Sequence, residues 1–221
     1  MESNYSLNRV SDSAFSVIKD GKPEYELKRV NGLWACTCTG YYYRGTCKHI
    51  DMLKGKVADS EIGSVDEIHT AGEIEKINKS LYESVQDYDY TLSGDYRRGV
   101  DIVTSLPVIV FAEVKVFKEF IGKLDKERFK ATIADDNIVR GYFDRVPVVF
   151  MRTDRANHAT TLLATTGSKE ENTRLRSIAK IRGWKLVENG LFDGNNNQIQ
   201  TNTEKDIYEK LGEVYKEPNK R

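Results

Sequence analysis

The residues best suited to chemistry in this chain are three cysteines and a histidine between positions 36 and 49. Cys36, Cys38 and Cys47 are all the cysteines of the 221 residues, and His49 follows closely. Three thiolates and one imidazole fill the tetrahedral shell of a structural zinc ion and leave no place for water. An odd number of cysteines is also a poor disulfide set. We therefore predict one structural Zn²⁺ per chain, the alternative being three buried thiols beside an unrelated histidine.

Two secondary-structure elements must bring the pair Cys36–Cys38 close to the pair Cys47–His49. The stretch 25–30 alternates as a half-buried strand does, the Asn-Gly dipeptide at 31–32 is a strong hairpin signal, and 33–36 returns as the second strand. The second ligand pair falls in a helix predicted to begin near Thr46. The zinc ion would join the hairpin to this helix.

The whole pattern, Cys-x-Cys-x8-Cys-x-His with Leu-Trp before it and Ile after it, resembles a SWIM-type zinc finger over residues 5–53. The resemblance implies a ββα module that binds DNA or protein. Basic residues outnumber acidic ones here and tyrosines occupy 41–43, so the module could pair with phosphates and stack on bases. Alternatively, the tyrosines are core residues and the basic residues form a solvated face.

The composition becomes acidic between 57 and 89, which we predict to be a linker. Within it, the stretch 72–86 has the apolar spacing of an amphipathic helix. The apolar positions are Ile74, Ile77, Leu81 and Val85. We expect this face to pack on the next domain and the acidic face to point to solvent, the alternative being a contact with another protein.

From Tyr90 onward the pattern mixes strands and helices. The predicted strands are 106–114, 129–133, 137–143, 146–151 and, with a turn, 184–192. The predicted helices are 117–124, 155–164, one opened by a Ser168–Glu171 capping box, and one capped at Thr203.

Four ordered strings make residues 90–221 resemble the X-family DNA polymerases, the β-type enzymes of the nucleotidyltransferase superfamily. They are Gly-Asp-Tyr-Arg-Arg-Gly at 94–99, Thr-Gly-Ser at 166–168 with Asn172 and Arg176, the stretch 184–192, and the stretch 204–208 with 215–221. The resemblance implies an α+β fold: the ββα zinc module, then a mixed palm-type sheet, then a C-terminal subdomain of helices and a small sheet. The expected domains are 1–56 (zinc module), 57–89 (linker and helix), 90–165 (palm) and 166–221 (C-terminal subdomain).

The same resemblance implies three carboxylates that hold two Mg²⁺ ions for nucleotidyl transfer. By the family's spacing these positions fall on Ser105, Pro107 and Val149. None of them offers the anionic oxygen that Mg²⁺ prefers, so Mg²⁺ is not expected. Asp95 also stands where the family has a serine that contacts the triphosphate, and its charge would repel phosphate. We therefore predict a pseudoenzyme.

An active nucleotidyltransferase with relocated carboxylates remains the alternative. Several aspartates of the same region are candidates: Asp101, Asp135, Asp136, Asp144 and Asp154. None of them forms an Asp-x-Asp pair, whose spacing would place two carboxylates on one face of a strand.

The residues that contact nucleic acid in the family are still matched in this sequence. The resemblance assigns phosphate contacts to Arg97 and Arg98 and minor-groove contacts to Asn172 and Arg176, and Arg174 and Lys180 extend the basic run. Such contacts give affinity that weakens with salt. A helix surface kept charged for solubility is the alternative.

Overall composition sets the remaining expectations. Lys and Arg total 34 and so do Asp and Glu, which gives a formal charge of +0 and no global basic field. No apolar run approaches the roughly 18 residues of a membrane span, and the N-terminus lacks a signal-peptide pattern. We expect a cytoplasmic protein with DNA as partner and no membrane contact. A second protein bound by the zinc module or the acidic linker would instead indicate an adaptor or inhibitor.

Overall fold

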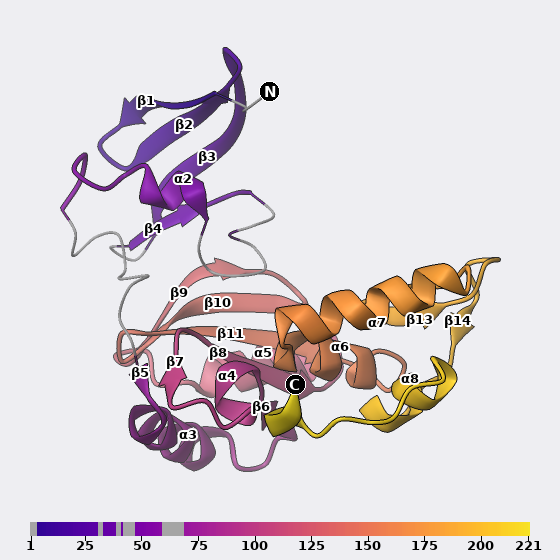
Figure 1. The fold of residues 1–221 in the computed structure, drawn as a ribbon. Helices are drawn as coiled ribbons and strands as arrows, with labels where there is room; N and C mark the ends of the chain where they lie inside the picture. The colour runs from indigo at the N-terminus through magenta and orange to yellow at the C-terminus, as the bar shows by residue number, and fades with distance from the viewer. Residues whose placement is uncertain (1–3, 31–32, 39–40, 42–46, 59–68) are drawn as a thin grey trace.

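The computed structural model describes residues 4–30, 33–38, 41, 47–58 and 69–221, and the structural statements below concern these residues. The predicted turn at 31–32, the helix start near Thr46, and Tyr42 and Tyr43 lie outside them. Figure 1 shows a small N-terminal sheet beside a larger sheet, with the C-terminal helices extending to one side.

The N-terminal module is a four-stranded antiparallel sheet in the order β1-β2-β3-β4. Its strands are β1 (Tyr5–Ser11), β2 (Ala14–Lys19), β3 (Lys22–Val30) and β4 (Leu33–Cys36), and a short helix α2 (Lys48–Asp51) follows. The pairing of Val30 with Leu33 confirms the predicted hairpin. The expected ββα module had two strands, whereas the sheet has four, because β1 and β2 were not predicted. β1 alternates only over its first half and is exposed from Asn8 onward. β2 does alternate, with Phe15 and Val17 buried, so its pattern was present in the sequence and was overlooked.

The larger sheet is mixed and has five strands in the order β6-β8-β11-β10-β9. They are β6 (Tyr90–Leu92), β8 (Leu106–Phe111), β9 (Phe129–Ala134), β10 (Ile138–Phe143) and β11 (Val146–Thr153). β8 and β11 run parallel, and the other pairs are antiparallel. The predicted strands are confirmed, with ends moved by a few residues; β8 stops at Phe111 because the chain turns into α5 (Val114–Lys123).

Helices α3 (Ala71–Val85) and α5 cover one face of this sheet. The apolar stripe predicted for 72–86 is confirmed, since Ile74, Ile77, Leu81 and Val85 are buried in the core. A Thr70–Glu73 capping box begins α3. Just before it, β5 (His69–Thr70) pairs with β7 (Ile102–Val103). The acidic segment therefore supplies a core helix to the larger sheet.

The C-terminal part packs three helices on a small sheet. Its elements are α6 (His158–Thr166), α7 (Lys169–Ile181), β12 (Lys185–Val187), β13 (Gly190–Phe192), β14 (Gln198–Ile199), α8 (Glu204–Lys210) and a 3₁₀ turn (Pro218–Lys220). α6 begins later than predicted because the Asp154 carboxylate accepts the amides of Ala156 and Asn157 and holds them in a turn. Trp184 packs against this core, whereas Trp34 is buried in the N-terminal module.

In the described part of the chain, no helix combines the length and apolar character that crossing a membrane requires.

Candidate functional site

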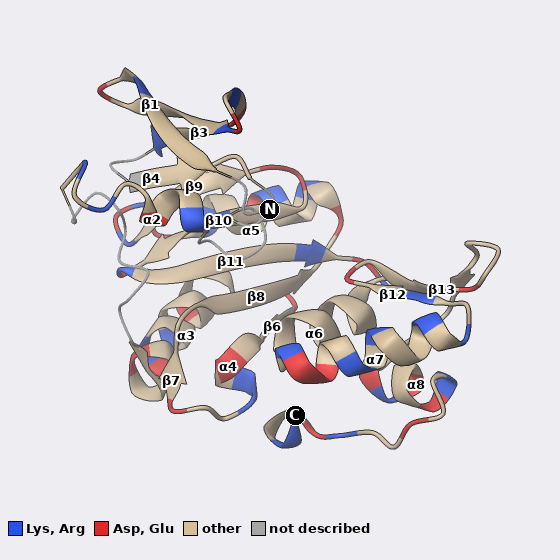
Figure 2. Ribbon diagram, turned by 45° about the horizontal axis from the view of Figure 1, so that its top comes forward, with Lys and Arg blue, Asp and Glu red and all other residues tan. Residues whose placement is uncertain are grey.

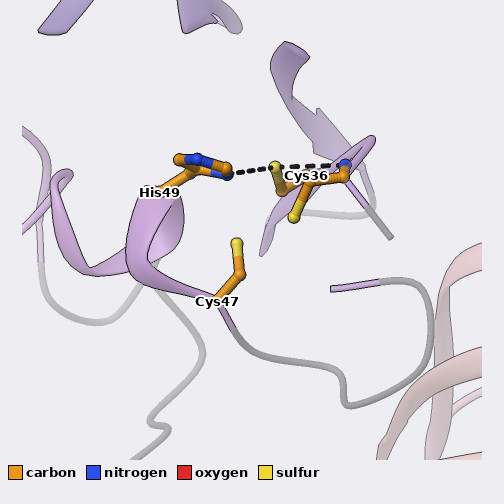
Figure 3. A group of neighbouring side chains, drawn as sticks. Cys36, Cys47 and His49 are labelled. Carbon is orange, nitrogen blue, oxygen red and sulfur yellow. Dashed lines mark hydrogen bonds between the residues drawn. The ribbon is translucent and has the colours of Figure 1, made fainter. Parts of the chain in front are cut away.

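The predicted metal ligands come together in the N-terminal module. Cys36 ends β4, Cys38 follows two residues later, Cys47 caps α2 and His49 lies in its first turn. Their ligand atoms all lie within 4.8 Å of one another, and all four residues are buried. Figure 3 shows the side chains of Cys36, Cys47 and His49 pointing toward one another.

The surroundings of the cluster suit a zinc ion. His49 Nδ1 lies 3.6 Å from Cys36 Sγ, and the amide of Tyr41 donates to Cys38 Sγ at 3.3 Å. The hydrogen bond from the Cys36 thiol lowers the pKa of Cys47, so Cys47 loses its proton most readily. Buried thiolates that accept amide hydrogen bonds are the donors that zinc prefers. The cluster is therefore compatible with a structural zinc site.

The three positions where the family's carboxylates were expected also lie together. Pro107 of β8 pairs directly with Val149 of β11, and Ser105 immediately precedes β8. Ser105 and Val149 line one cavity of about 10 Å³. The Pro107 ring packs against the turn at Gly94, where an added Cβ would lie 2.8 Å from Pro107 Cδ. A proline ring and an isopropyl group thus stand side by side on the sheet.

The candidate relocated carboxylates are engaged in separate places. Asp135 accepts the amides of Asn137 and Ile138 in the β9–β10 turn. Two more form ion pairs: Asp136 with Lys118 and Asp144 with Arg128. Asp154 accepts a hydrogen bond in the turn before α6, and Asp101 is exposed before β7. Among the residues that the structure describes, the Cys-His cluster is the only group of three or more His, Cys, Asp or Glu side chains close enough together to hold an ion.

Arg97 and Arg98 lie in the short helix α4 (Gly94–Arg97) and its C-cap, and both make internal contacts. Arg97 pairs with Glu204 of α8 at 2.7 Å, and Arg98 pairs with Asp95 and donates to the Thr166 carbonyl. Burial opposes ionisation of Glu204, but hydrogen bonds from Arg97 and Arg221 outweigh it and lower its pKa. These contacts attach α4 to the C-terminal part.

Arg221 completes this arrangement. Its side chain is 0% exposed, and its Nη1 donates to Glu204 at 2.6 Å. Glu204 therefore accepts hydrogen bonds from two guanidinium groups, whose residues lie 107 and 17 positions away along the chain. Sequence reasoning missed Glu204, because a glutamate in the first turn of a helix ordinarily faces solvent and stabilises the helix dipole.

The remaining predicted nucleic-acid residues lie on α7. Asn172 donates to the Ala164 carbonyl at 2.8 Å, and Arg174 pairs with Glu171 and Glu213. Arg176 has an exposed partner, Glu188, and Lys180 is exposed. Figure 2 shows acidic residues at the start of α7 and basic residues farther along it. Arg176 and Lys180 are the two predicted residues whose heads face solvent.

Glu171 makes the C-terminal part sensitive to acid. Hydrogen bonds from Arg174, Lys216 and Tyr208 lower its pKa from 4.5 to about 2. A lowered carboxyl pKa gives stability that is complete above the unfolded value and is lost as pH falls toward the folded value. We expect the free energy of unfolding to fall by up to about 3 kcal/mol from this group between about pH 5 and pH 2. Urea titrations should show that Glu171→Gln removes this part of the pH dependence; an unchanged slope would contradict it.

Comparison with known proteins identifies the C-terminal part and the fold. Residues 161–221 match the family model described as DNA polymerase beta thumb. The structure resembles polymerase beta from Leishmania infantum in its ternary gap complex, with a TM-score of 0.67 and 17% identity over 82% of this chain and 83% of that chain. Its ternary P/T complex gives a TM-score of 0.64 and 16% identity over 82% and 91%. A search of curated proteins by sequence gave no match. The C-terminal part is thus similar to a polymerase beta thumb, and the chain has a mixed α+β fold that resembles polymerase beta, which agrees with the coarser part of the predicted resemblance.

Proposed function

We propose that this chain is a DNA-binding pseudoenzyme built on the polymerase-beta-like fold. The proposed layout keeps a SWIM-type zinc module at 1–56, the acidic segment with its core helix at 57–89, a palm-type domain at 90–165 and the C-terminal subdomain at 166–221. The zinc module would add a second contact to DNA or protein. The observation that carries the proposal is the pairing of Pro107 with Val149 next to Ser105.

Nucleotidyl transfer needs two metal ions that activate the attacking hydroxyl and neutralise the leaving pyrophosphate. The three expected positions carry a hydroxyl (Ser105), a pyrrolidine ring (Pro107) and an isopropyl group (Val149). None of these groups supplies the carboxylate oxygen that Mg²⁺ requires. The Pro107 ring lies against the turn at Gly94, and Asp95 faces Arg98 beside it. This packing supports a site without nucleotide chemistry.

The nucleic-acid side of the proposal depends on the exposed part of α7. Arg176 and Lys180 can reach phosphates, because their heads face solvent and the Arg176–Glu188 pair is a weak surface ion pair. The polymerase beta structures that resemble this chain are DNA complexes. The internal pairs of Arg97, Arg98 and Arg174 favour structural roles for those residues.

The deciding experiment incubates the protein with one-nucleotide-gapped DNA, labelled deoxynucleotides and Mg²⁺ or Mn²⁺. We expect gel retardation without primer extension. Extension that EDTA abolishes would overturn the proposal and favour relocated carboxylates. Absence of both signals would also overturn it and favour the protein-binding adaptor.

Reversing charge on α7 should weaken DNA binding. For Arg176→Glu combined with Lys180→Glu, we expect the slope of log affinity against log salt to flatten by about two, since each lost phosphate contact removes nearly one unit. Fluorescence anisotropy over a salt series measures this slope. Lys115→Glu with Lys126→Glu makes the same charge change on α5 and the loop after it, and should leave most of the affinity intact. Equal losses in both double variants would contradict a site on α7.

A further inference from the structure

The N-terminal module contacts the face of the five-stranded sheet that α3 and α5 leave open. Figure 1 places β4 beside β9, and Ile133 of β9 packs against the core of the module. Strand alternation puts Val149 on this open face, because its neighbours Val148 and Phe150 belong to the core under the helices. The module therefore lies over the face that carries the expected carboxylate positions.

Tyr41 is one residue of the module that reaches this face. It is 2% exposed and lines the same small cavity as Ser105, Arg140, Tyr142 and Val149. Its neighbours in the sheet are themselves buried, with Tyr142 at 8% and Val149 at 5% exposure. An aromatic side chain from the module thus closes the space beside the expected metal positions.

The position of Tyr41 is tied to the metal cluster. Its amide donates to Cys38 Sγ at 3.3 Å, and its hydroxyl donates to the Trp34 carbonyl at 3.3 Å. Both partners depend on the folded module, whose ligands converge around the cluster. A change in metal loading would therefore change the anchor of Tyr41.

We propose that the Cys₃His module is a metal-dependent cover over the open face of the sheet. With metal bound, Tyr41 and Ile133 hold it closed over Ser105 and Val149; without metal, the face becomes accessible. This inference stands apart from the proposed function, because it concerns access to the sheet whether or not DNA binds. DNA on the exposed side of α7 is compatible with the closed state, whereas a ligand at Ser105 requires the module to move.

Hydroxyl-radical footprinting of the full chain tests this cover. Tyr142 is the reporter beneath the module, and Tyr208, which is fully buried in the thumb, is the internal reference. Chelation of zinc should raise the oxidation rate of Tyr142 by roughly tenfold and leave Tyr208 unchanged, as expected when a buried strand face opens to solvent. Protection of Tyr142 in the zinc-free protein would overturn the proposal.

A variant of the sheet separates opening from loss of the module's own fold. Ile133→Asp places a charge in the contact without altering the metal ligands, so it should raise Tyr142 oxidation while zinc content, measured by mass spectrometry, stays at one per chain. Ala134→Asp makes a matched change at the exposed neighbouring position and should leave Tyr142 protected. Equal oxidation in the two variants, or none in Ile133→Asp, would overturn the proposed contact.

Discussion

Zinc removal unfolds the N-terminal module while residues 69–221 keep their fold. This result is expected because the module's core is small and the cluster links β4 to α2, so the fold of the module depends on the metal. Structural zinc contributes an apparent 10–16 kcal/mol, roughly, to domains of this kind, so its loss exceeds what such a core supplies. Cys47→Ser should have the same effect, because it removes the thiol that ionises most readily.

Hydrogen–deuterium exchange separates the two parts. Amides of β2 and β3 should exchange fully in the zinc-free protein, whereas those of β8 and β11 stay protected. Asp51→Asn, an exposed change in α2, is the matched control and should keep both regions protected. Simultaneous loss of protection in both parts would show that they unfold as one unit and refute the two-part layout.

Glu204→Gln destabilises the C-terminal part by about 3–5 kcal/mol, because removing one partner of a buried ionic group leaves the others uncompensated. Here the uncompensated groups are the fully buried Arg221 guanidinium and Arg97. The loss should appear as a lower urea midpoint without a change in the slope of the transition.

Glu209→Gln provides the matched comparison on the same helix. Its exposed pair with Lys205 spans 3.8 Å, so its loss should cost less than about 1 kcal/mol. Similar midpoints for the two variants would mean that the contacts of Glu204 contribute no more than a surface ion pair.

Local patterns of the sequence predicted a large share of this architecture. The hairpin of β3 and β4, the apolar stripe of α3 and the strands β8 to β11 all follow from side-chain periods that the structure reproduces. The four metal ligands converge as their spacing implied. Such features depend on neighbours within a few residues, which a single sequence displays directly.

Contacts between distant residues could not be predicted in this way. A run of arginines before a strand looks the same whether it faces phosphate or a glutamate more than a hundred positions away, and Arg97 meets Glu204 across 107 residues. Similarly, half of the capping box predicted at Ser168 is present, but the Glu171 carboxylate instead binds Arg174, Lys216 and Tyr208. The position of Tyr41 in the cavity that Val149 also lines depends on tertiary packing, and no local sequence pattern signals it.

The placement of the two tryptophans in separate cores gives this protein a pair of built-in optical probes. Trp34 is buried in the module beside the cysteine cluster, and Trp184 is partly buried against the core of the C-terminal part. As these are the only tryptophans in the chain, Trp184→Phe leaves an emission spectrum that reports the module alone, and Trp34→Phe leaves one that reports the C-terminal part alone. Metal loading and unfolding of the C-terminal part can therefore be followed in the unlabelled protein as two distinct fluorescence signals.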